Sequence, residues 1–498
     1  MKGDLTKGAL WLTTARIITN LLAFVSTLLL ARLLTPEDFG LVAIATTILA
    51  IVSAITDISM GNALIHHHGP TEEHFQTAFT MNIIRDGFVG LVMMACAPLV
   101  AKTYGDPRLL LLMLVFGVAS ALKGLYNPKT VVFTRKLVFW QDFVQTIAQK
   151  VAGLVFSATV AIIFHSYWAL VAGQLAAQAI ATILSYAFVS FRPRFNLKHM
   201  RELWGFSVWL TLGQMVTTLT LKFDHLLIGW YLGRPTLGLY TVGDNLAVLP
   251  TREATQPLQQ VLFPGLARLV GDPERLRYGY KLAQSFVSAI ALPIGFGFAL
   301  LAHSLVLAAM GQKWLAAVQV IQILACVFAL ETLGTAVQPL AMAKGQTKML
   351  FQRDCLSLVV RIPIIIVGMY FFGLLGIVYA RGVAGLIGIA INMRFVSRLT
   401  GLSMFEQLAA NTRSLLSVAG MSAAILTLQH YYGIDGERLE LIVKNGCYIA
   451  AGALVYLLVH GVLWMLAGKP GGAESELLKM LSKFTDKIKS RKPVVPGQ

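Results

Sequence analysis

The chain has 498 residues, of which 56% are hydrophobic and 13% are charged, and its mean hydropathy is +0.69. A soluble protein of this composition would be hard to keep in solution, so the composition indicates a polytopic membrane protein. The formal net charge is +17. Because the Lys and Arg residues lie mainly between the apolar stretches, we attribute this charge to membrane orientation and expect no nucleic-acid partner.

Apolar stretches of about 20 or more residues, long enough to cross a bilayer, follow one another along the chain. The first extends to about Leu34, which is too long for the hydrophobic part of a signal peptide. Turn sequences such as Thr35-Pro36-Glu37-Asp38 and Gly233-Arg234-Pro235 separate the stretches. The pattern predicts an all-α fold with about fourteen transmembrane helices. The predicted spans are 8–33, 39–65, 75–101, 108–130, 138–164, 166–191, 201–232, 236–264, 280–308, 314–343, 348–372, 374–398, 410–432 and 440–467.

The distribution of basic residues predicts the orientation of the spans. With the N-terminus placed inside, the inner loops and the C-terminal tail hold about four Lys and Arg residues for each one in the outer loops. This asymmetry predicts that both termini lie in the cytoplasm and that the number of spans is even. No connecting loop is long enough to form a soluble domain, which argues against catalysis in such a domain.

An internal repeat organises the chain. Trp11-Leu12-Thr13 recurs as Trp209-Leu210-Thr211, and the same offset of 198 aligns Gly40-Leu41 with Gly238-Leu239. Six predicted spans separate the copies, so both enter the membrane in the same direction and form a parallel repeat, as in transporters built from two related halves. We predict an N-lobe (1–200), a C-lobe (201–402), two further spans (403–467) and a tail (468–498).

The tail has the pattern of a basic amphipathic helix. Apolar residues from Leu477 to Ile488 fall near one helical face, and lysines occupy much of the remaining surface. Such a helix would lie on the anionic inner leaflet, whereas a frayed tail is the alternative.

Ionisable residues at membrane depth are the candidates for function, because each costs about 2.5–3.5 kcal/mol if it faces lipid. They are therefore expected to line a cavity or to pair with each other. Arg85-Asp86 and Arg252-Glu253 are sequence neighbours, but adjacent residues project about 100° apart on a helix and need not pair. The basic members are Arg16, Arg85, Lys150, Lys222, Arg252, Arg361 and Arg381.

Polar residues form stripes on three predicted helices. On span 1, Arg16 and Asn20 share a face, and their repeat partners are Gln214 and Thr218 on span 7. The stripes predict a water-filled cavity between the lobes whose basic groups favour an anionic substrate; interhelical hydrogen bonding and ion pairing are the alternative. The predicted substrate-binding residues are Arg16, Asn20, Arg85, Lys150, Gln214, Lys222, Asn245, Arg252, Gln256, Arg361 and Arg381. The acids predicted to couple ions or to pair are Asp57, Asp224, Asp244, Glu253 and Glu331.

The sequence predicts no metal site and no other cofactor, and it leaves H⁺ or Na⁺ coupling open. His66-His67-His68, with Glu72, Glu73 and His74 nearby, is a candidate metal site by composition. Consecutive histidines project in different directions, however, and a solvated loop is the preferred interpretation. No nucleophile elbow or phosphate-binding glycine loop is present, so we expect no catalytic residues and no enzyme.

Several segments resemble a known family. They are LLARLLTPEDFGL at 29–41, ALIHHHGPTEEHFQTAF at 63–79, KFDHLLIGWYLGRPTLGLYTVGDNLAVLP at 222–250 and LFPGLARL at 262–269. These segments are similar to the Wzx-type polysaccharide-transport flippases, which share a superfamily with the lipid II flippases and the multidrug and toxin extruders. The resemblance implies two six-helix lobes around a central cavity. It also implies translocation of undecaprenyl-diphosphate-linked oligosaccharides across the bacterial inner membrane, for exopolysaccharide or O-antigen and lipopolysaccharide assembly.

The expected partners follow from the same resemblance. They are the lipid-linked oligosaccharide, membrane lipids and, as a hypothesis, the polymerase and other assembly proteins, with the transporter acting as a monomer. Two other functions stay open at this point. One is a cation-coupled multidrug exporter of the same fold. The other is a membrane polysaccharide polymerase or ligase, which typically carries a large outer loop that this chain lacks.

Overall fold

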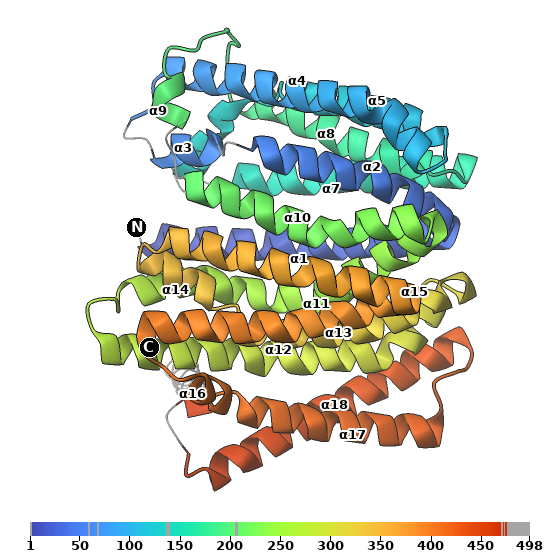
Figure 1. Ribbon diagram of the computed structural model, residues 1–498, viewed down its shortest axis with the longest axis vertical. Coiled ribbons are helices and arrows are strands. Elements are labelled where there is room, and N and C mark those ends of the chain that lie inside the picture. The colour runs from blue at the N-terminus through green and yellow to red at the C-terminus, as the bar shows by residue number, and fades with distance from the viewer. Residues whose placement is uncertain are drawn as a thin grey trace, which may run out of the picture. The chain divides into compact units, whose positions relative to one another are not determined.

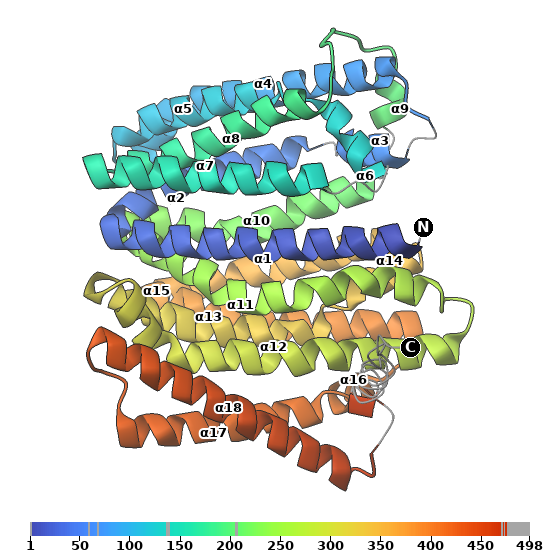
Figure 2. The same cartoon turned by 180° about the vertical axis from the view of Figure 1, so that it is seen from behind.

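The computed structural model describes residues 2–57, 60–66, 69–135, 140–204, 208–469, 472 and 474–475, apart from the side chains of 2–17, 62, 66, 134, 203–204 and 208–210. Over these residues the chain is helical and forms no strand, which confirms the all-α prediction (Figure 1; Figure 2 gives the view from behind). The helices are α1 (Lys2–Leu33), α2 (Pro36–Thr56), α3 (Met60–His66), α4 (Glu72–Thr103), α5 (Arg108–Lys123), α6 (Val131–Arg135), α7 (Trp140–Phe164), α8 (Trp168–Phe188), α9 (Met200–Trp204), α10 (Val208–Tyr231), α11 (Arg234–Ala267), α12 (Pro273–Ala309), α13 (Val318–Glu331), α14 (Val337–Ala343), α15 (Thr347–Thr400), α16 (Met404–Ala409), α17 (Thr412–Tyr432) and α18 (Arg438–Leu466), with 3₁₀ turns η1 (Pro128–Thr130), η2 (Gln312–Ala317) and η3 (Thr332–Gly334).

The predicted turns lie where the helices begin. Thr35 caps α2: its hydroxyl accepts a hydrogen bond from the Asp38 backbone N–H, and the Asp38 carboxylate accepts one from the Thr35 N–H at 2.9 Å. Pro36 occupies the first turn, where a missing N–H costs nothing. The turn that the sequence predicted at this point is therefore a helix cap that fixes the start of α2.

Each predicted span overlaps a helix or half of one, but several ends differ. The second predicted span is interrupted, because α2 ends at Thr56 and Asp57 has an extended backbone before α3 begins. Eight helices of the described part of the chain are long and apolar enough to cross a membrane. The protein is therefore a multi-pass membrane protein, while the number of fourteen spans stays a prediction.

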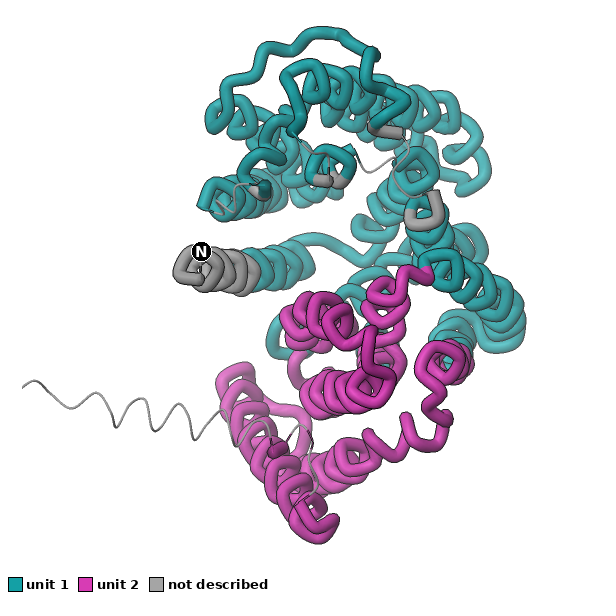
Figure 3. The backbone as a smooth tube through the Cα atoms, turned by 90° about the vertical axis from the view of Figure 1, so that its left-hand side faces the viewer, with its two compact units in different colours: residues 1–246, 306–320, 347–384 teal, residues 247–305, 321–346, 385–498 magenta. Residues whose placement is uncertain are grey.

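Contacts divide the chain into two compact units (Figure 3). Unit 1 comprises 1–246, 306–320 and 347–384, and unit 2 comprises 247–305, 321–346 and 385–498. In unit 1, one apolar cluster joins the end of α1 to α7 and α8 through Leu34, Ala161 and Ala169. The unit 2 core is a larger cluster of buried apolar side chains. Its members include Leu292, Leu301, Ala329, Leu333, Ile389, Val418, Met421 and Tyr448. The lobes predicted at 1–200 and 201–402 stay a prediction.

The two copies of the repeat meet at a pair of glycines in unit 1. A Cβ atom added to Gly40 of α2 would overlap the carbonyl oxygen of Arg234, and one added to Gly238 of α11 would overlap that of Pro36. The contact is reciprocal, because 40 and 238, and 36 and 234, are both repeat partners at the offset of 198. Reciprocity of this kind indicates a local two-fold relation between the N-terminal turns of α2 and α11. Only glycine allows the two backbones to approach this closely.

Candidate functional site

A helical hairpin in unit 1 brings two of the predicted arginines to one place. The long element α15 consists of two helices joined at Gly373, whose φ of 56° and ψ of −131° interrupt the helical conformation. On either side of this point, Gly368 and Gly376 lie against each other so closely that a Cβ on either would overlap the other's carbonyl oxygen. The chain therefore folds back on itself, and Arg361 on the first arm and Arg381 on the second reach the same carboxylate.

That carboxylate belongs to Asp224 on α10. Its Oδ2 atom accepts a hydrogen bond from Arg361 Nη2 at 2.7 Å and one from the Tyr240 hydroxyl at 2.9 Å, and it lies 3.5 Å from Arg381 Nε. Arg381 Nη1 also donates to the Tyr240 oxygen at 2.8 Å and to Asp244 Oδ1. We call Asp224, Tyr240, Asp244, Arg361 and Arg381 the Asp224 cluster. It ties α10, the first part of α11 and both arms of α15 together.

Burial makes these pairings obligatory. Asp224 is fully buried and Arg381 is only 4% exposed. An unpaired charge in such a place costs several kcal/mol, and removing one member of a buried pair typically costs about 3–5 kcal/mol. The two carboxylates and two guanidinium groups cancel in charge. The cluster therefore holds α15 in place without placing a net charge at membrane depth.

The cluster leaves some polar atoms without partners among the described residues. Asp224 Oδ1, Arg361 Nε and Nδ1 of the neighbouring His225 are buried and accept or donate no hydrogen bond there. The ring of His225 lies edge-on to Tyr240, with 5.3 Å between the ring centroids. A proton or small cation at Asp224 would find acceptor capacity at Oδ1. Ion coupling at Asp224 therefore stays a prediction, with Oδ1 as the atom that would bind the ion.

A second charge cluster lies where α2 ends against α4. Arg85 donates to Asp86 Oδ1 through Nε at 3.0 Å and through Nη2 at 2.6 Å, and it donates to Asp57 Oδ1 through Nη1 at 3.3 Å. Helical geometry gave no reason for Arg85 and Asp86 to pair, but the length of the arginine side chain lets it fold back to its neighbour. The same is true of Arg252, whose Nε lies 3.1 Å from Glu253 Oε1.

Arg85 also lines a mostly apolar pocket of about 540 Å³ in unit 1. Its walls come from the end of α2, from α4, from the start of α9 and from the segment before it. They include Ile55, Ile84, Phe88, Leu197 and Met200. Among the described residues that line this pocket, Arg85 is the one charged group, and it is paired with two carboxylates.

The other predicted site residues are spread over both units. Arg252 is in unit 2 and its side chain is 56% exposed, whereas Lys222 in unit 1 is half-buried. The side chains of Arg16 and His66 lie outside the described part of the structure, as do the residues His67 and His68. Of the remaining positions, Lys150, Gln214 and Asn245 are exposed, and Asn20, Gln256, Glu253 and Glu331 are half-buried.

The family of the chain follows from its sequence as a whole. A profile of the family described as "Polysaccharide biosynthesis protein" matches residues 29–319, which is more than half of the chain. The chain belongs to this polysaccharide biosynthesis family. The resemblance inferred from the motifs at 29–41 and 222–250 is thereby confirmed, and both motifs fall inside the matched range.

Two curated relatives of this polysaccharide biosynthesis protein cover much of its length. The chain is 24% identical over 378 residues to the lipopolysaccharide biosynthesis protein WzxC of Escherichia coli (strain K12), covering 74% of this chain and 76% of that protein. It is 22% identical over 493 residues to the succinoglycan biosynthesis transport protein ExoT of Rhizobium meliloti (strain 1021), covering 98% and 96%. The alignment with ExoT therefore includes the C-terminal residues beyond the matched family profile.

Solved structures show the fold of this polysaccharide biosynthesis protein. The lipid II flippase MurJ in an inward closed conformation aligns with a TM-score of 0.71 at 12% identity, covering 91% of this chain and 98% of that one. An inward-facing multidrug resistance transporter of the MATE family aligns with a TM-score of 0.60 at 13% identity, covering 78% and 99%. The fold is therefore that of the MurJ and MATE transporters, and at these identities the likeness concerns the fold alone.

Proposed function

We propose that this protein is a flippase that translocates undecaprenyl-diphosphate-linked oligosaccharide repeat units across the bacterial inner membrane by alternating access. It would serve exopolysaccharide or lipopolysaccharide assembly and make or break no covalent bond. The observation that carries the proposal is the family membership, together with an alignment over nearly the full length of ExoT, a succinoglycan biosynthesis transport protein. The MurJ-like fold is consistent with a lipid-linked substrate.

The proposed diphosphate ligands are Arg16 and Arg252, with Lys222 assisting. Guanidinium groups bind phosphate oxygens in a bidentate manner and suit a diphosphate better than ammonium groups do. Arg252 is paired with Glu253, but its side chain is 56% exposed. Arg361, Arg381 and Arg85 are held by carboxylates and their side chains are at most 17% exposed. They would contact substrate only in a state in which those pairs open, so we assign them first to holding the helices and second to the substrate.

The proposal places both termini in the cytoplasm, in line with the excess of basic residues in the loops on that side. The substrate would enter from the cytoplasmic leaflet, where it is assembled, and leave from the outer leaflet. Polymerase and other assembly proteins would act on the product at that side. A monomer suffices for this scheme, because the chain holds both copies of the repeat.

Reconstitution tests the proposal directly. The purified full chain is placed in liposomes with a fluorescent undecaprenyl-diphosphate oligosaccharide, and a membrane-impermeant glycosidase or quencher reports which leaflet holds the label. We expect transfer between leaflets that empty liposomes do not show. Absence of transfer by folded protein, combined with efflux of a cationic dye driven by a H⁺ or Na⁺ gradient, would instead identify a multidrug exporter of the same fold.

A further inference from the structure

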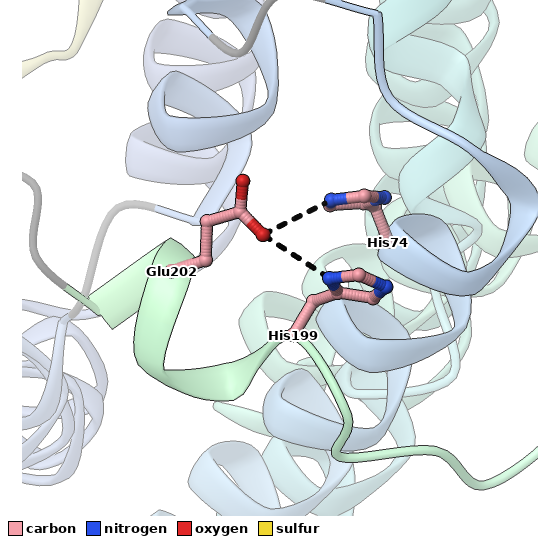
Figure 4. Close-up of side chains that lie close together, drawn as sticks. All are labelled: His74, His199 and Glu202. Carbon is pink, nitrogen blue, oxygen red and sulfur yellow. Dashed lines mark hydrogen bonds and ion pairs between the residues drawn. The ribbon is translucent and has the colours of Figure 1, made fainter.

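Two histidines and a glutamate from distant parts of unit 1 converge near the start of α4 (Figure 4). His74 is in the first turn of α4, His199 directly precedes α9, and Glu202 is in α9. Glu202 Oε2 lies 3.4 Å from His74 Nε2 and 3.1 Å from His199 Nδ1. The three atoms lie within 4.8 Å of one another. They are separated from the Asp224 cluster in sequence and in the elements that carry them.

The outer nitrogen of each imidazole faces an oxygen atom. His74 Nδ1 lies 2.7 Å from the Thr71 hydroxyl, and His199 Nε2 lies 3.3 Å from Glu73 Oε2. The Thr71 backbone N–H donates a hydrogen bond to His74 Nδ1 at 3.2 Å, as part of the cap at the start of α4. When Glu73 accepts a hydrogen bond from His199 Nε2, His199 Nδ1 presents its lone pair toward Glu202. His74 Nε2 would present its lone pair once Nδ1 is protonated and donates to Thr71 Oγ1, which gives up the bond from the Thr71 N–H. Metal-bound histidines are usually held in this way, by a hydrogen bond from the opposite ring nitrogen.

From this arrangement we propose that His74 Nε2, His199 Nδ1 and the Glu202 carboxylate bind a divalent transition metal ion, with Zn²⁺ as the expected occupant. Two imidazoles and a carboxylate are a ligand set that zinc accepts, with water in the fourth position. Metal–ligand bonds of about 2.0–2.2 Å in a tetrahedron place ligand atoms roughly 3.3 Å apart. The two distances to Glu202 Oε2 already match this spacing.

One movement completes the site. The two imidazole rings are stacked, with 3.8 Å between their centroids and 20° between their planes, so their lone pairs run nearly parallel. His199 has to turn toward Glu202 for both lone pairs to meet at one point. His199 lies in the turn before α9, and its side chain, which stacks on His74, is 22% exposed. His74, 5% exposed, is the fixed member of the site.

The ion would fasten the connector between the two repeats to the first repeat. The connector at 189–199 already touches α4, because the Asn196 N–H donates to Thr80 Oγ1 at 2.9 Å and Lys198 Nζ donates to Glu73 Oε2 at 2.9 Å. The Lys198–Glu73 pair is exposed, and an exposed ion pair of this kind contributes little to stability. A metal ion bound by His199, Glu202 and His74 would add a further link between the connector and α4. This link would be less sensitive to ionic strength than an exposed ion pair is.

The test measures zinc on the full chain purified in detergent without a polyhistidine tag. The protein is stripped with a chelator, incubated with ZnCl₂ and desalted, and its metal content is measured by mass spectrometry. We expect about one zinc ion per chain for the natural protein. His199→Gln and Glu202→Gln should hold less than about a fifth of that amount, because each removes a ligand atom. Glu73→Gln should weaken zinc binding by about ten- to a hundredfold, the usual effect of losing a hydrogen-bonding partner of a ligand.

Two matched controls guard against zinc bound elsewhere. His430→Gln, at a histidine of α17 in unit 2, should keep one zinc ion per chain. The triple variant with Gln at His66, His67 and His68 should also keep it. Zinc should further slow tryptic cleavage after Lys198 and Arg201 in the natural protein and not in His199→Gln. Failure of the natural protein to hold zinc, or equal binding by folded His199→Gln, would show a purely hydrogen-bonded cluster and overturn the proposal.

Discussion

Gly40 and Gly238 are repeat partners, and each leaves space for the carbonyl oxygen that belongs to the other's helix turn: Arg234 for Gly40 and Pro36 for Gly238. The repeat found in the sequence is therefore also a contact in unit 1. Beside it, Arg234 and Arg108 both pair with Glu37 and with the buried Asp106. Charge pairs and close backbone packing together hold α2, α5 and α11 at this end of unit 1.

The first prediction concerns these glycines. Gly40→Ala and Gly238→Ala should each lower the apparent Tm of the detergent-solubilised protein, because the new methyl group overlaps a backbone carbonyl and overpacking costs about 1–3 kcal/mol or more. Thermal unfolding followed by intrinsic fluorescence provides the measurement. Gly87→Ala on α4 is the control: a Cβ there meets no atom within 4 Å, and alanine favours the helix by about 1 kcal/mol. Equal Tm values for all three variants would contradict the close approach of α2 and α11.

The second prediction concerns the Asp224 cluster. Asp224→Asn should destabilise the protein by about 3–5 kcal/mol, because it leaves two guanidinium groups buried with less opposing charge. Arg361→Gln should also destabilise the protein. The loss of unfolding free energy in the double variant should be smaller than the sum of the two single losses, by at least about 1 kcal/mol. The exposed pair Asp272 and Arg275 serves as the control cycle, in which coupling should stay below about 1 kcal/mol. Additive effects at Asp224 and Arg361 would show that the ion pair is not formed.

The third prediction concerns orientation in the membrane. In a variant without the four natural cysteines, a cysteine at Gly233 should react with an impermeant maleimide added to intact cells, and a cysteine at Lys198 should react only after the membrane is opened. The reason is the excess of Lys and Arg in the loops assigned to the cytoplasm. The opposite labelling pattern would invert the proposed orientation.

The fourth prediction concerns substrate binding. Arg16→Ala and Arg252→Ala should each weaken binding of the lipid-linked diphosphate by roughly ten- to a hundredfold, since a charge-assisted hydrogen bond contributes about 1.5–3 kcal/mol. Flipping in liposomes should fall accordingly, and the Lys variants should recover part of it because charge survives and bidentate geometry does not. Arg194→Ala, in the exposed connector, is the control. Normal flipping by both alanine variants would assign these arginines a structural role.

The fifth prediction concerns the tail, most of which lies outside the described residues. Its basic amphipathic pattern predicts attachment to the inner leaflet and no part in translocation. A chain that ends after Gly468 should therefore fold and keep some of its flipping activity, while its tail, fused to a fluorescent protein, should bind anionic vesicles in a salt-sensitive way. Complete loss of flipping in a folded, truncated protein would contradict this assignment.

The helices, the internal repeat and the family are recognisable from the amino-acid sequence. Helix starts depend on residues within one turn, as Thr35, Pro36 and Asp38 show, and apolar stretches mark the helices directly. The offset of 198 and the motifs at 29–41 and 222–250 are visible without coordinates. All of these signals are local or are simple comparisons of the chain with itself, so they do not depend on the path of the chain in space.

The charge pairs, in contrast, follow from how the chain folds in space. Asp224 meets Arg361 across 137 positions, and His74 meets Glu202 across 128. No local sequence pattern predicts these partners, because the contacts depend on the hairpin at Gly373 and on the return of the connector to α4. Helical geometry also does not determine whether the neighbours Arg85 and Asp86 pair, because this depends on the rotamer of the long arginine side chain. Whether a charged side chain pairs with another or lines a cavity therefore depends on three-dimensional packing. The spacing of residues along the sequence does not specify that packing.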